Sequence, residues 1–354
     1  MQGDDSAERH WTKPWHFAQL ADTQFGMLRQ NQSWDEEQAL AESAVEHINR
    51  LRPKFVVVCG DLVNALPNGP NADPAQQEKQ VRDFKATMGR IDSGIRLVCT
   101  CGNHDVGERV SRSTVDRYKS RFGPDYFAFW AGGCRCIVLN SSLHSAQEEC
   151  FWDPERGLGT GESLESLERD KREARALAAE QDNWLAAELK AIQSLRQGSG
   201  DAPPVHAMVF THIPPFIVAP NEPKGYFNYE PAIRMPLLSQ LRAAGVSKWF
   251  CGHYHRNAGG YDRTSGGSKT GADLEVVVTS AIGMHLIDNK KDPLGLGGFE
   301  VPTVLSEKDS GLRLVAVDRK RIGHRWFALE SVPRCVPDPA AAAAEWATDS
   351  KSKL

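Results

Sequence analysis

The sequence predicts an α/β fold in which β-sheets are covered by helices. Strand-like and helix-like segments alternate between residues 16 and 101, and two of the strand-like segments, FVVVC and RLVCTC, are almost continuously apolar. Strands of this kind are typical of sheets that carry helices on their faces. A third observation is that polar side chains follow directly after five of the predicted strands.

The first half of the chain gives the clearest alternation of elements. Ser33 and Glu36 are typical of a capping box at a helix start, and Asp73 before Pro74 is typical of an N-cap followed by the first helical residue. The predicted elements are, in order, a strand at 16–22, a helix at about 33–51, a strand at 54–60, a helix at about 74–91 and a strand at 95–101.

The second half begins with a predicted hairpin and ends with another. We expect one main domain over residues 15–330, with a polar insertion at about 144–170 and flexible segments at 1–14 and 331–354. The predicted elements are a hairpin of 127–130 with 134–140, a helix at about 170–196, strands at 206–211, 247–251 and 274–281, a helix at 234–244, and a hairpin of 312–318 with 322–329.

Composition argues against several classes of protein. The 354 residues carry a formal net charge of −4, so no basic surface for nucleic acid or an anionic membrane is expected. The apolar runs are too short to span a membrane, and the polar N-terminus lacks the apolar core of a signal peptide. Most of the eight cysteines lie in strand-like runs, which favours reduced, packed thiols over disulfides or zinc ligands.

The polar side chains at the strand ends predict a metal centre. In α/β sheets, ligands bind outside the carboxyl ends of the strands. Imidazole nitrogens combined with carboxylate and amide oxygens, without thiolates, suit Mn, Fe, Zn or Mg. One carboxylate can bridge two ions about 3.5–4 Å apart, as in phosphoryl-transfer hydrolases. The residues concerned are Asp22, Gln24, Asp61, Asn103, His212, His253 and His255.

The order of these motifs resembles that of the calcineurin-like metallophosphoesterase superfamily. The five blocks are DTQ, GDLVN, GNHD, TH and GHYH. The segments ADTQFG, CGDLVNALP, GHYHRNAGG and VVTSAIG are further similar to the calcineurin-like phosphoesterase domain-containing protein group, for which the resemblance implies serine/threonine protein phosphatases. It also implies the metallo-dependent phosphatase fold, a four-layer α/β sandwich with two central mixed sheets flanked by helices.

The resemblance assigns roles to individual positions. It implies one divalent ion on Asp22, Gln24, Asp61 and His255, and a second on Asp61, Asn103, His212 and His253. His104 would hold the phosphate and protonate the leaving oxygen, Asp105 would orient His104, and Asn64 would support the ligands from behind. Many members have histidine where this chain has Gln24, so we expect a weakly held first ion and a need for added Mn or Mg, with Mn favoured.

The expected reaction is in-line attack on a phosphomonoester by a hydroxide that bridges the two ions, with a phosphoprotein or a phosphorylated small molecule as substrate. Tyr226, Asn228, Arg256 and Asn257 are candidate substrate contacts. Two alternatives remain open at this stage. One is a nucleotide diphosphatase acting on ADP-ribose or CDP-alcohols, and the other is a catalytically silent metal-binding scaffold.

The chain ends in Ser352-Lys353-Leu354, the tripeptide that directs proteins into peroxisomes. We therefore expect the peroxisomal import receptor as a partner, and a peroxisomal location, if the source is a eukaryote. A cytoplasmic location is the expectation otherwise.

Overall fold

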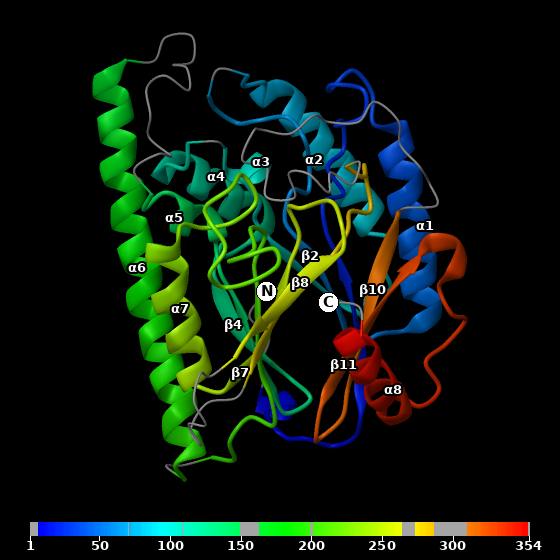
Figure 1. Cartoon of the computed structure of the whole chain (residues 1–354). Helices are drawn as coiled ribbons and strands as arrows, with labels where there is room; N and C mark the ends of the chain where they lie inside the picture. The colour runs from blue at the N-terminus through cyan, green and yellow to red at the C-terminus, as the bar shows by residue number, and fades with distance from the viewer. Residues whose placement is uncertain are drawn as a thin grey trace.

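The computed structural model has four layers: two β-sheets packed face to face, with helices on both outer sides (Figure 1). It describes residues 6–69, 71–107, 109–148, 163–198, 201–263, 273–286 and 310–352. This arrangement confirms the predicted α/β sandwich with two central mixed sheets.

The first sheet has the strand order β11-β10-β1-β2-β3. Its three N-terminal strands are parallel, and β10 and β11 extend the sheet in antiparallel pairing. All five residues of β2 are buried, as expected for a strand covered on both faces. The strands are β1 (Trp15–Leu20), β2 (Phe55–Cys59), β3 (Arg96–Thr100), β10 (Gly311–Val317) and β11 (Ile322–Ala328).

The second sheet has the order β4-β5-β6-β7-β9-β8. Its four inner strands pair in parallel, and each edge strand is antiparallel to its neighbour. The strands are β4 (Phe127–Ala131), β5 (Cys134–Val138), β6 (Ala207–Phe210), β7 (Val246–Cys251), β8 (Ala258–Asp262) and β9 (Leu274–Val278).

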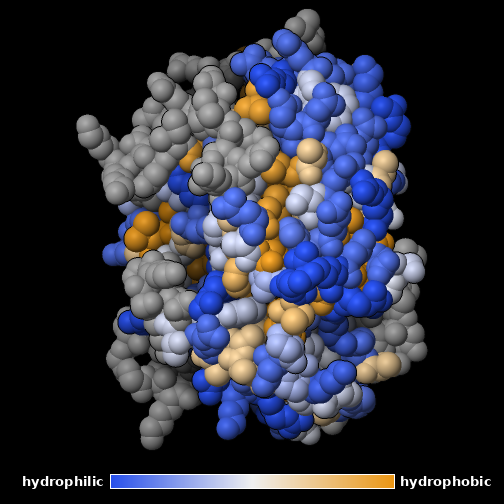
Figure 2. Space-filling view, turned by 90° about the vertical axis from the view of Figure 1, so that its right-hand side faces the viewer, coloured by the Kyte–Doolittle hydropathy of each residue, from blue (hydrophilic) through white to orange (hydrophobic). Residues whose placement is uncertain are grey.

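Helices bury the outer faces of both sheets. Apolar residues of α1, α2, α4 and α8 pack against the first sheet, and those of α7 and the C-terminal half of α6 pack against the second. The face on the right of Figure 1, which carries α1, is mainly hydrophilic with smaller apolar areas between (Figure 2). The helices are α1 (Asp35–Leu51), α2 (Pro74–Met88), α3 (Asn103–Val106), α4 (Arg112–Phe122), α5 (Ser141–Ser145), α6 (Leu164–Arg196), α7 (Pro231–Ala243) and α8 (Pro339–Ser352), with short 3-10 helices η1 (Ser6–Arg9) and η5 (Leu329–Ser331).

An aromatic core joins the two sheets. Phe17 and Phe55 of the first sheet stack with ring centroids 4.6 Å apart, and Phe17 meets Phe210 and Phe250 of the second sheet edge-on at 5.8 and 5.5 Å. The seven cysteines that the structure describes are free, and five of them are buried, which agrees with the predicted packing role. No helix among the described residues is long and apolar enough to cross a membrane.

Several predicted boundaries are wrong. Helix α1 starts at Asp35 after Trp34, which provides no side-chain cap, so Ser33 and Glu36 do not form a capping box. Asp73 does cap α2 by accepting a hydrogen bond from the Gln76 N–H. Helix α6 begins at Leu164, inside the predicted insertion, while residues 149–162 of that insertion lie outside the described residues. Helix α4 and strand β8 were not predicted.

The two ends of the chain are more structured than expected. The C-terminal segment, predicted to be flexible, contains α8, which buries Ala343 and Trp346 against the first sheet. Near the N-terminus, Glu8 of η1 forms an ion pair with Lys54 and accepts a hydrogen bond from the Gly132 N–H. Residues 353 and 354 lie outside the described residues.

Candidate active site

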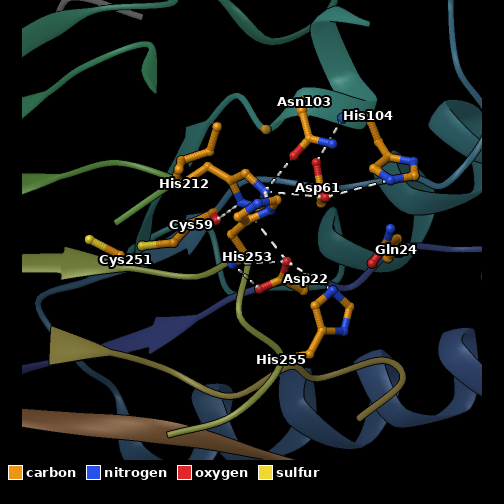
Figure 3. Close-up of polar contacts among 12 residues, drawn as sticks. Asp22, Gln24, Cys59, Asp61, Asn103, His104, His212, Cys251, His253 and His255 are labelled. Carbon is orange, nitrogen blue, oxygen red and sulfur yellow. Dashed lines mark hydrogen bonds and ion pairs between the residues drawn. The ribbon is translucent and has the colours of Figure 1, made fainter. Parts of the chain in front are cut away.

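Side chains from the segments that follow β1, β2, β3, β6 and β7 lie close together (Figure 3). His212 lies at the centre of the cluster. Its Nε2 atom is 3.1 Å from Asn103 Oδ1, 3.1 Å from His253 Nδ1 and 3.2 Å from Asp61 Oδ2. The potential ligand atoms of Asp61, Asn103, His212 and His253, which lie far apart in the sequence, therefore converge on one position.

A second group of donors adjoins the first. His255 Nε2 lies 3.3 Å from Asp22 Oδ1, and the Asp22 carboxylate accepts a hydrogen bond of 3.0 Å from the His253 backbone N–H. Gln24 lines the same pocket as Asp61 and His255. All seven predicted ligands are thus brought together, in two groups that meet at Asp22, Asp61 and the histidines (Figure 3).

The backbone turns sharply at the ligands. Left-handed backbone is uncommon for residues other than glycine, and such strain is often found at functional sites. Here it lets residues just after a strand turn their side chains into one centre. The φ angles are 50° at Asp22, 40° at Gln24, 47° at Asp61, 67° at His253 and 52° at His255.

Gly102 in the GNHD block makes room for the Asp61 carboxylate. A Cβ atom at this position would lie 2.1 Å from Asp61 Oδ1 and 2.3 Å from the Asp61 backbone nitrogen. The Asp61 carboxylate also accepts a hydrogen bond of 2.9 Å from the His104 N–H, at the start of α3. The glycine therefore allows β3 and its loop to approach the residue at the centre of the site.

Backbone carbonyls fix the orientation of two histidine rings. His212 Nδ1 donates to the Cys59 carbonyl at 2.8 Å, and His255 Nδ1 donates to the Met284 carbonyl. Because a carbonyl only accepts, the proton of the neutral ring lies on Nδ1, and Nε2 presents its lone pair to the site. Second-sphere hydrogen bonds of this kind are typical of histidines that bind metals.

The charges in the cluster favour a bound cation. Burial lowers the pKa of His212, but the Asp61 and Asp22 carboxylates outweigh it and raise that pKa to about 9. Burial raises the pKa of Asp61, but His212 and His104 hold it below its usual range. Burial and the neighbouring His212 lower the pKa of His253. The Asp61 carboxylate thus stays ionised and attracts positive charge.

The donor set fits divalent metal ions. Gln24 Oε1 is buried and accepts no hydrogen bond from the residues that the structure describes, while Gln24 Nε2 donates to Asn64 Oδ1 at 3.3 Å. A buried amide oxygen without a partner is costly, so a missing ligand atom is the natural explanation. The ligand atoms of Asp61, His212 and His253 all lie within 4.8 Å of one another.

His104 lies beside the ligands with part of its ring exposed. Its Nδ1 donates to the Asn64 carbonyl at 2.5 Å, and its Nε2 lies 4.0 Å from Asp61 Oδ2. The expectation that Asp105 orients His104 is therefore wrong. The Asp105 carboxylate instead accepts the backbone N–H groups of Gly102 and Leu62, and burial together with Asp61 raises its pKa to about 8.

The pocket over the ligands has an apolar rim. Met27, Tyr226, Phe227 and Leu286 line it together with His104 and five of the seven predicted ligands, which are Gln24, Asp61, Asn103, His253 and His255. The Tyr226 ring stacks on the His253 ring with centroids 5.4 Å apart, so this predicted contact does lie at the site. Sequence reasoning missed Met27 and Leu286. The position of Met27 close to the DTQ block was the one signal that could have indicated it, and no such signal exists for Leu286.

The other predicted substrate contacts do not line this pocket. Asn228 is buried and donates to Glu222 Oε1 while its own Oδ1 accepts from the Gly225 N–H. Asn257 Oδ1 accepts from Arg313 Nη2 at 2.6 Å. The Arg256 guanidinium lies 4.7 Å from the Tyr254 ring centroid. The Asn228 and Asn257 predictions are corrected, because the Asn228 amide is used within its own loop and the Asn257 oxygen accepts from Arg313 of β10. A substrate contact by Arg256 stays a prediction.

Comparison with known proteins gives a consistent result. Residues 16–257 match the model of the calcineurin-like phosphoesterase family. The chain is 34% identical over 336 residues to the serine/threonine-protein phosphatase CPPED1 of Mus musculus, covering 92% of this chain and 87% of that protein. It is 33% identical to the CPPED1 protein of Homo sapiens, with the same coverage.

Solved structures show the same fold. A dimetal phosphatase from Danio rerio superposes with a TM-score of 0.54 at 17% identity, covering 90% of this chain and 97% of that one. A purple acid phosphatase from yellow lupin seeds superposes with a TM-score of 0.53 at 11% identity, covering 91% of this chain and 52% of that one.

Proposed function

Because the chain belongs to the calcineurin-like phosphoesterase family, we propose that it is a metal-dependent serine/threonine protein phosphatase. Membership makes it a phosphoesterase hydrolase. The convergence of seven donor side chains around Asp61 and His212 supports a functional centre, and the named activity of the CPPED1 relatives supports the substrate class.

We assign the ions to two sets of residues. Asp22, Gln24, Asp61 and His255 would hold one, and Asp61, Asn103, His212 and His253 the other, with manganese as the favoured metal. The unpartnered Gln24 oxygen and the close approach of the ligand atoms of Asp61, His212 and His253 support this assignment. Divalent ions bound here supply Lewis-acid stabilisation of phosphoryl oxygens and an activated water.

His104 is placed to act as the general acid. Its Nδ1 proton is held by the Asn64 carbonyl, so Nε2 is the atom available to a substrate in the pocket. In its protonated form, Nε2 donates to the leaving oxygen as the P–O bond breaks. General acid catalysis of this kind contributes about 10²–10⁴-fold.

Substrate competition tests the proposal. The purified chain is assayed with the same excess of Mn²⁺ on a phosphoserine peptide, p-nitrophenyl phosphate, ADP-ribose and CDP-choline. A higher kcat/KM for the phosphopeptide than for the other substrates supports a protein phosphatase. Preference for the nucleotides would replace that substrate class, and no hydrolysis of any substrate would leave a silent metal-binding scaffold.

Peroxisomal import through residues 352–354 is a separate proposal that is supported by the sequence alone. It requires that Leu354 is the last residue of the mature protein. Fusing the last ten residues to a fluorescent reporter, with Leu354→Ala as control, tests it by location in a eukaryotic cell.

A further inference from the structure

Four side-chain amides form a continuous chain of hydrogen bonds that ends in the candidate site. They belong to Gln80 in α2, Asn31 in the loop before α1, Asn64 after β2 and Gln24 after β1, and we call them the amide relay. An amide has a donor end and an acceptor end, so the direction in which it is held matters to its neighbours.

The direction of the relay is set at Gln80. Its Oε1 atom accepts the backbone N–H groups of Asn64 at 3.2 Å and Ala65 at 2.8 Å. A backbone N–H can only donate, so the oxygen of Gln80 must face these two groups. The Gln80 Nε2 atom is therefore turned away from the loop and faces Asn31.

Each following amide is then held in one orientation. Asn31 Oδ1 accepts from Gln80 Nε2 at 2.9 Å and from Asn64 Nδ2 at 2.8 Å. The Asn64 oxygen consequently faces Gln24 and accepts its Nε2 at 3.3 Å. What remains is Gln24 Oε1, which is buried and accepts no hydrogen bond within the described part of the chain.

The packing around the relay leaves room for the contact between Gln80 and Asn31. Gly26 has φ of 110°, and a Cβ atom there would lie 2.3 Å from Gln80 Nε2 and 2.9 Å from Asn31 Oδ1. Gln80 itself is completely buried. One turn earlier on α2, Gln77 Nε2 donates to the His104 carbonyl at 3.1 Å. One face of α2 thus supports both the loop of Asn64 and the loop of His104.

We propose that Gln80 and Asn31 are positioning residues, which act through Asn64 to turn the oxygen of Gln24, and not its nitrogen, toward the metal. Asn64 also holds His104 Nδ1 through its carbonyl, so the relay supports a ligand and the general acid together. The inference rests on the metal centre of the proposed function but does not depend on which phosphoester is cleaved.

A pair of isosteric, charge-matched variants tests the direction of the relay. In Gln80→Glu the carboxylate still accepts the two backbone N–H groups but cannot donate to Asn31, so Asn31, Asn64 and Gln24 all reverse. Asn31→Asp adds the same charge but keeps the acceptor that Gln80 and Asn64 need. Mn²⁺ binding is titrated calorimetrically at pH 8 for both variants, after thermal melting has confirmed that each is folded.

We expect Gln80→Glu to weaken the binding of one Mn²⁺ ion tenfold or more, because loss of ligand support typically costs 10–100-fold in metal affinity. Asn31→Asp should stay within about threefold of the wild type, since it keeps the direction of every hydrogen bond in the relay. Equal affinities for the two variants would overturn the proposal, because their added charge is the same and only the polarity differs.

A second substitution provides a rescue. Gln24→Glu offers an oxygen in either orientation, so Gln80→Glu should cost far less affinity in the Gln24→Glu background than in the wild type. An equal cost in both backgrounds would also overturn the relay. If the wild type binds two Mn²⁺ ions but hydrolyses no phosphoester, the proposed function fails while this test remains valid.

Discussion

His104 differs from the other histidines of the candidate site in exposure and partners. Its side chain is 22% exposed, whereas the side chains of His212 and His255 are 0% and 4% exposed. His212 and His255 each face an aspartate within 3.3 Å, but His104 Nε2 stands 4.0 Å from the nearest one. Because His104 is not one of the predicted metal ligands, it can exchange a proton with a substrate without removing a ligand from a metal ion.

His104→Ala is expected to retain Mn²⁺ binding and lose activity on substrates with poor leaving groups. The loss should be about 10²–10⁴-fold for a phosphoserine peptide and clearly smaller for p-nitrophenyl phosphate, because nitrophenolate needs less protonation. Steady-state kinetics on both substrates measure the difference, with the exposed His10→Ala as control. An equal loss on both substrates would contradict the role of general acid.

Gly102→Ala should disrupt the centre more than its small size suggests. The new methyl group would meet the Asp61 carboxylate at 2.1 Å, so either Asp61 or the α3 loop must move. We expect Mn²⁺ affinity to fall at least tenfold, measured by calorimetric titration. Gly94→Ala, where the nearest atom is 4.0 Å away, is the matched control and should bind like the wild type.

Residue types at strand ends were sufficient to predict which side chains converge at the site, but not the groups that orient them. The convergence of the seven candidate ligands could be predicted because each side chain follows a strand whose carboxyl end faces the site. The partner of His104 could not, because the Asn64 carbonyl is main chain and leaves no mark in the sequence. Asn228 was a plausible substrate contact by type, yet its amide is used by its own loop.

At the level of elements, alternation and apolar content predicted most strands and helices, and the misses have physical reasons. Strand β8 contains Gly259 and Gly260, which disfavour strands, and forms because β9 offers a partner along its whole length. The C-terminal segment was expected to be flexible, although α8 contains a run of alanines and alanine is the strongest helix former. What orders that helix is tertiary packing, which local sequence does not show.

Helix α8 should contribute to stability without contributing to metal binding. Trp346 is 5% exposed and packs edge-on against Phe327 with centroids 5.9 Å apart. Trp346→Ala should cost about 3–5 kcal/mol of unfolding free energy. Chemical denaturation measures it, and Mn²⁺ titration of the folded variant should match the wild type.

The neighbouring Glu345→Ala is the control for that helix. It removes an ion pair with Arg325 in which the glutamate is 64% exposed, and exposed pairs contribute little. A Trp346→Ala variant as stable as Glu345→Ala would show that α8 is dispensable to the fold.

At the scale of the whole molecule, a buried polar cluster bridges the two sheets alongside the aromatic core. Arg313 of the first sheet donates to Thr279 Oγ1 at 2.8 Å and to Asn257 Oδ1 at 2.6 Å, both on the side of the second sheet. His324 of β11 lies 3.1 Å from Glu275 of β9. Because Asn257 follows His255 by two residues, this cluster connects the packing of the sheets to the loop that carries the candidate ligands His253 and His255.

The same cluster should make the fold sensitive to mild acid. Burial lowers the pKa of His324 to about 4, against the opposing effect of Glu275, while the unfolded chain has the ordinary value near 6.5. The unfolded state therefore binds a proton below pH 6.5 that the folded state refuses until about pH 4. Stability must fall with pH across that interval, by about 2 kcal/mol between pH 7 and pH 5 from this residue.

His324→Gln isolates this contribution, because its amide can donate to Glu275 and accept from Arg313 but does not titrate. Urea unfolding at pH 7 and pH 5 should show a pH-dependent loss about 2 kcal/mol smaller in the variant than in the wild type. The two pH values keep Glu275 ionised, since Lys248 and His324 outweigh its burial and hold its pKa below the usual range. Equal losses of stability in the two proteins would mean that His324 accepts its proton as readily in the folded state as in the unfolded chain. The bridge between the sheets would then not depend on the neutral form of His324.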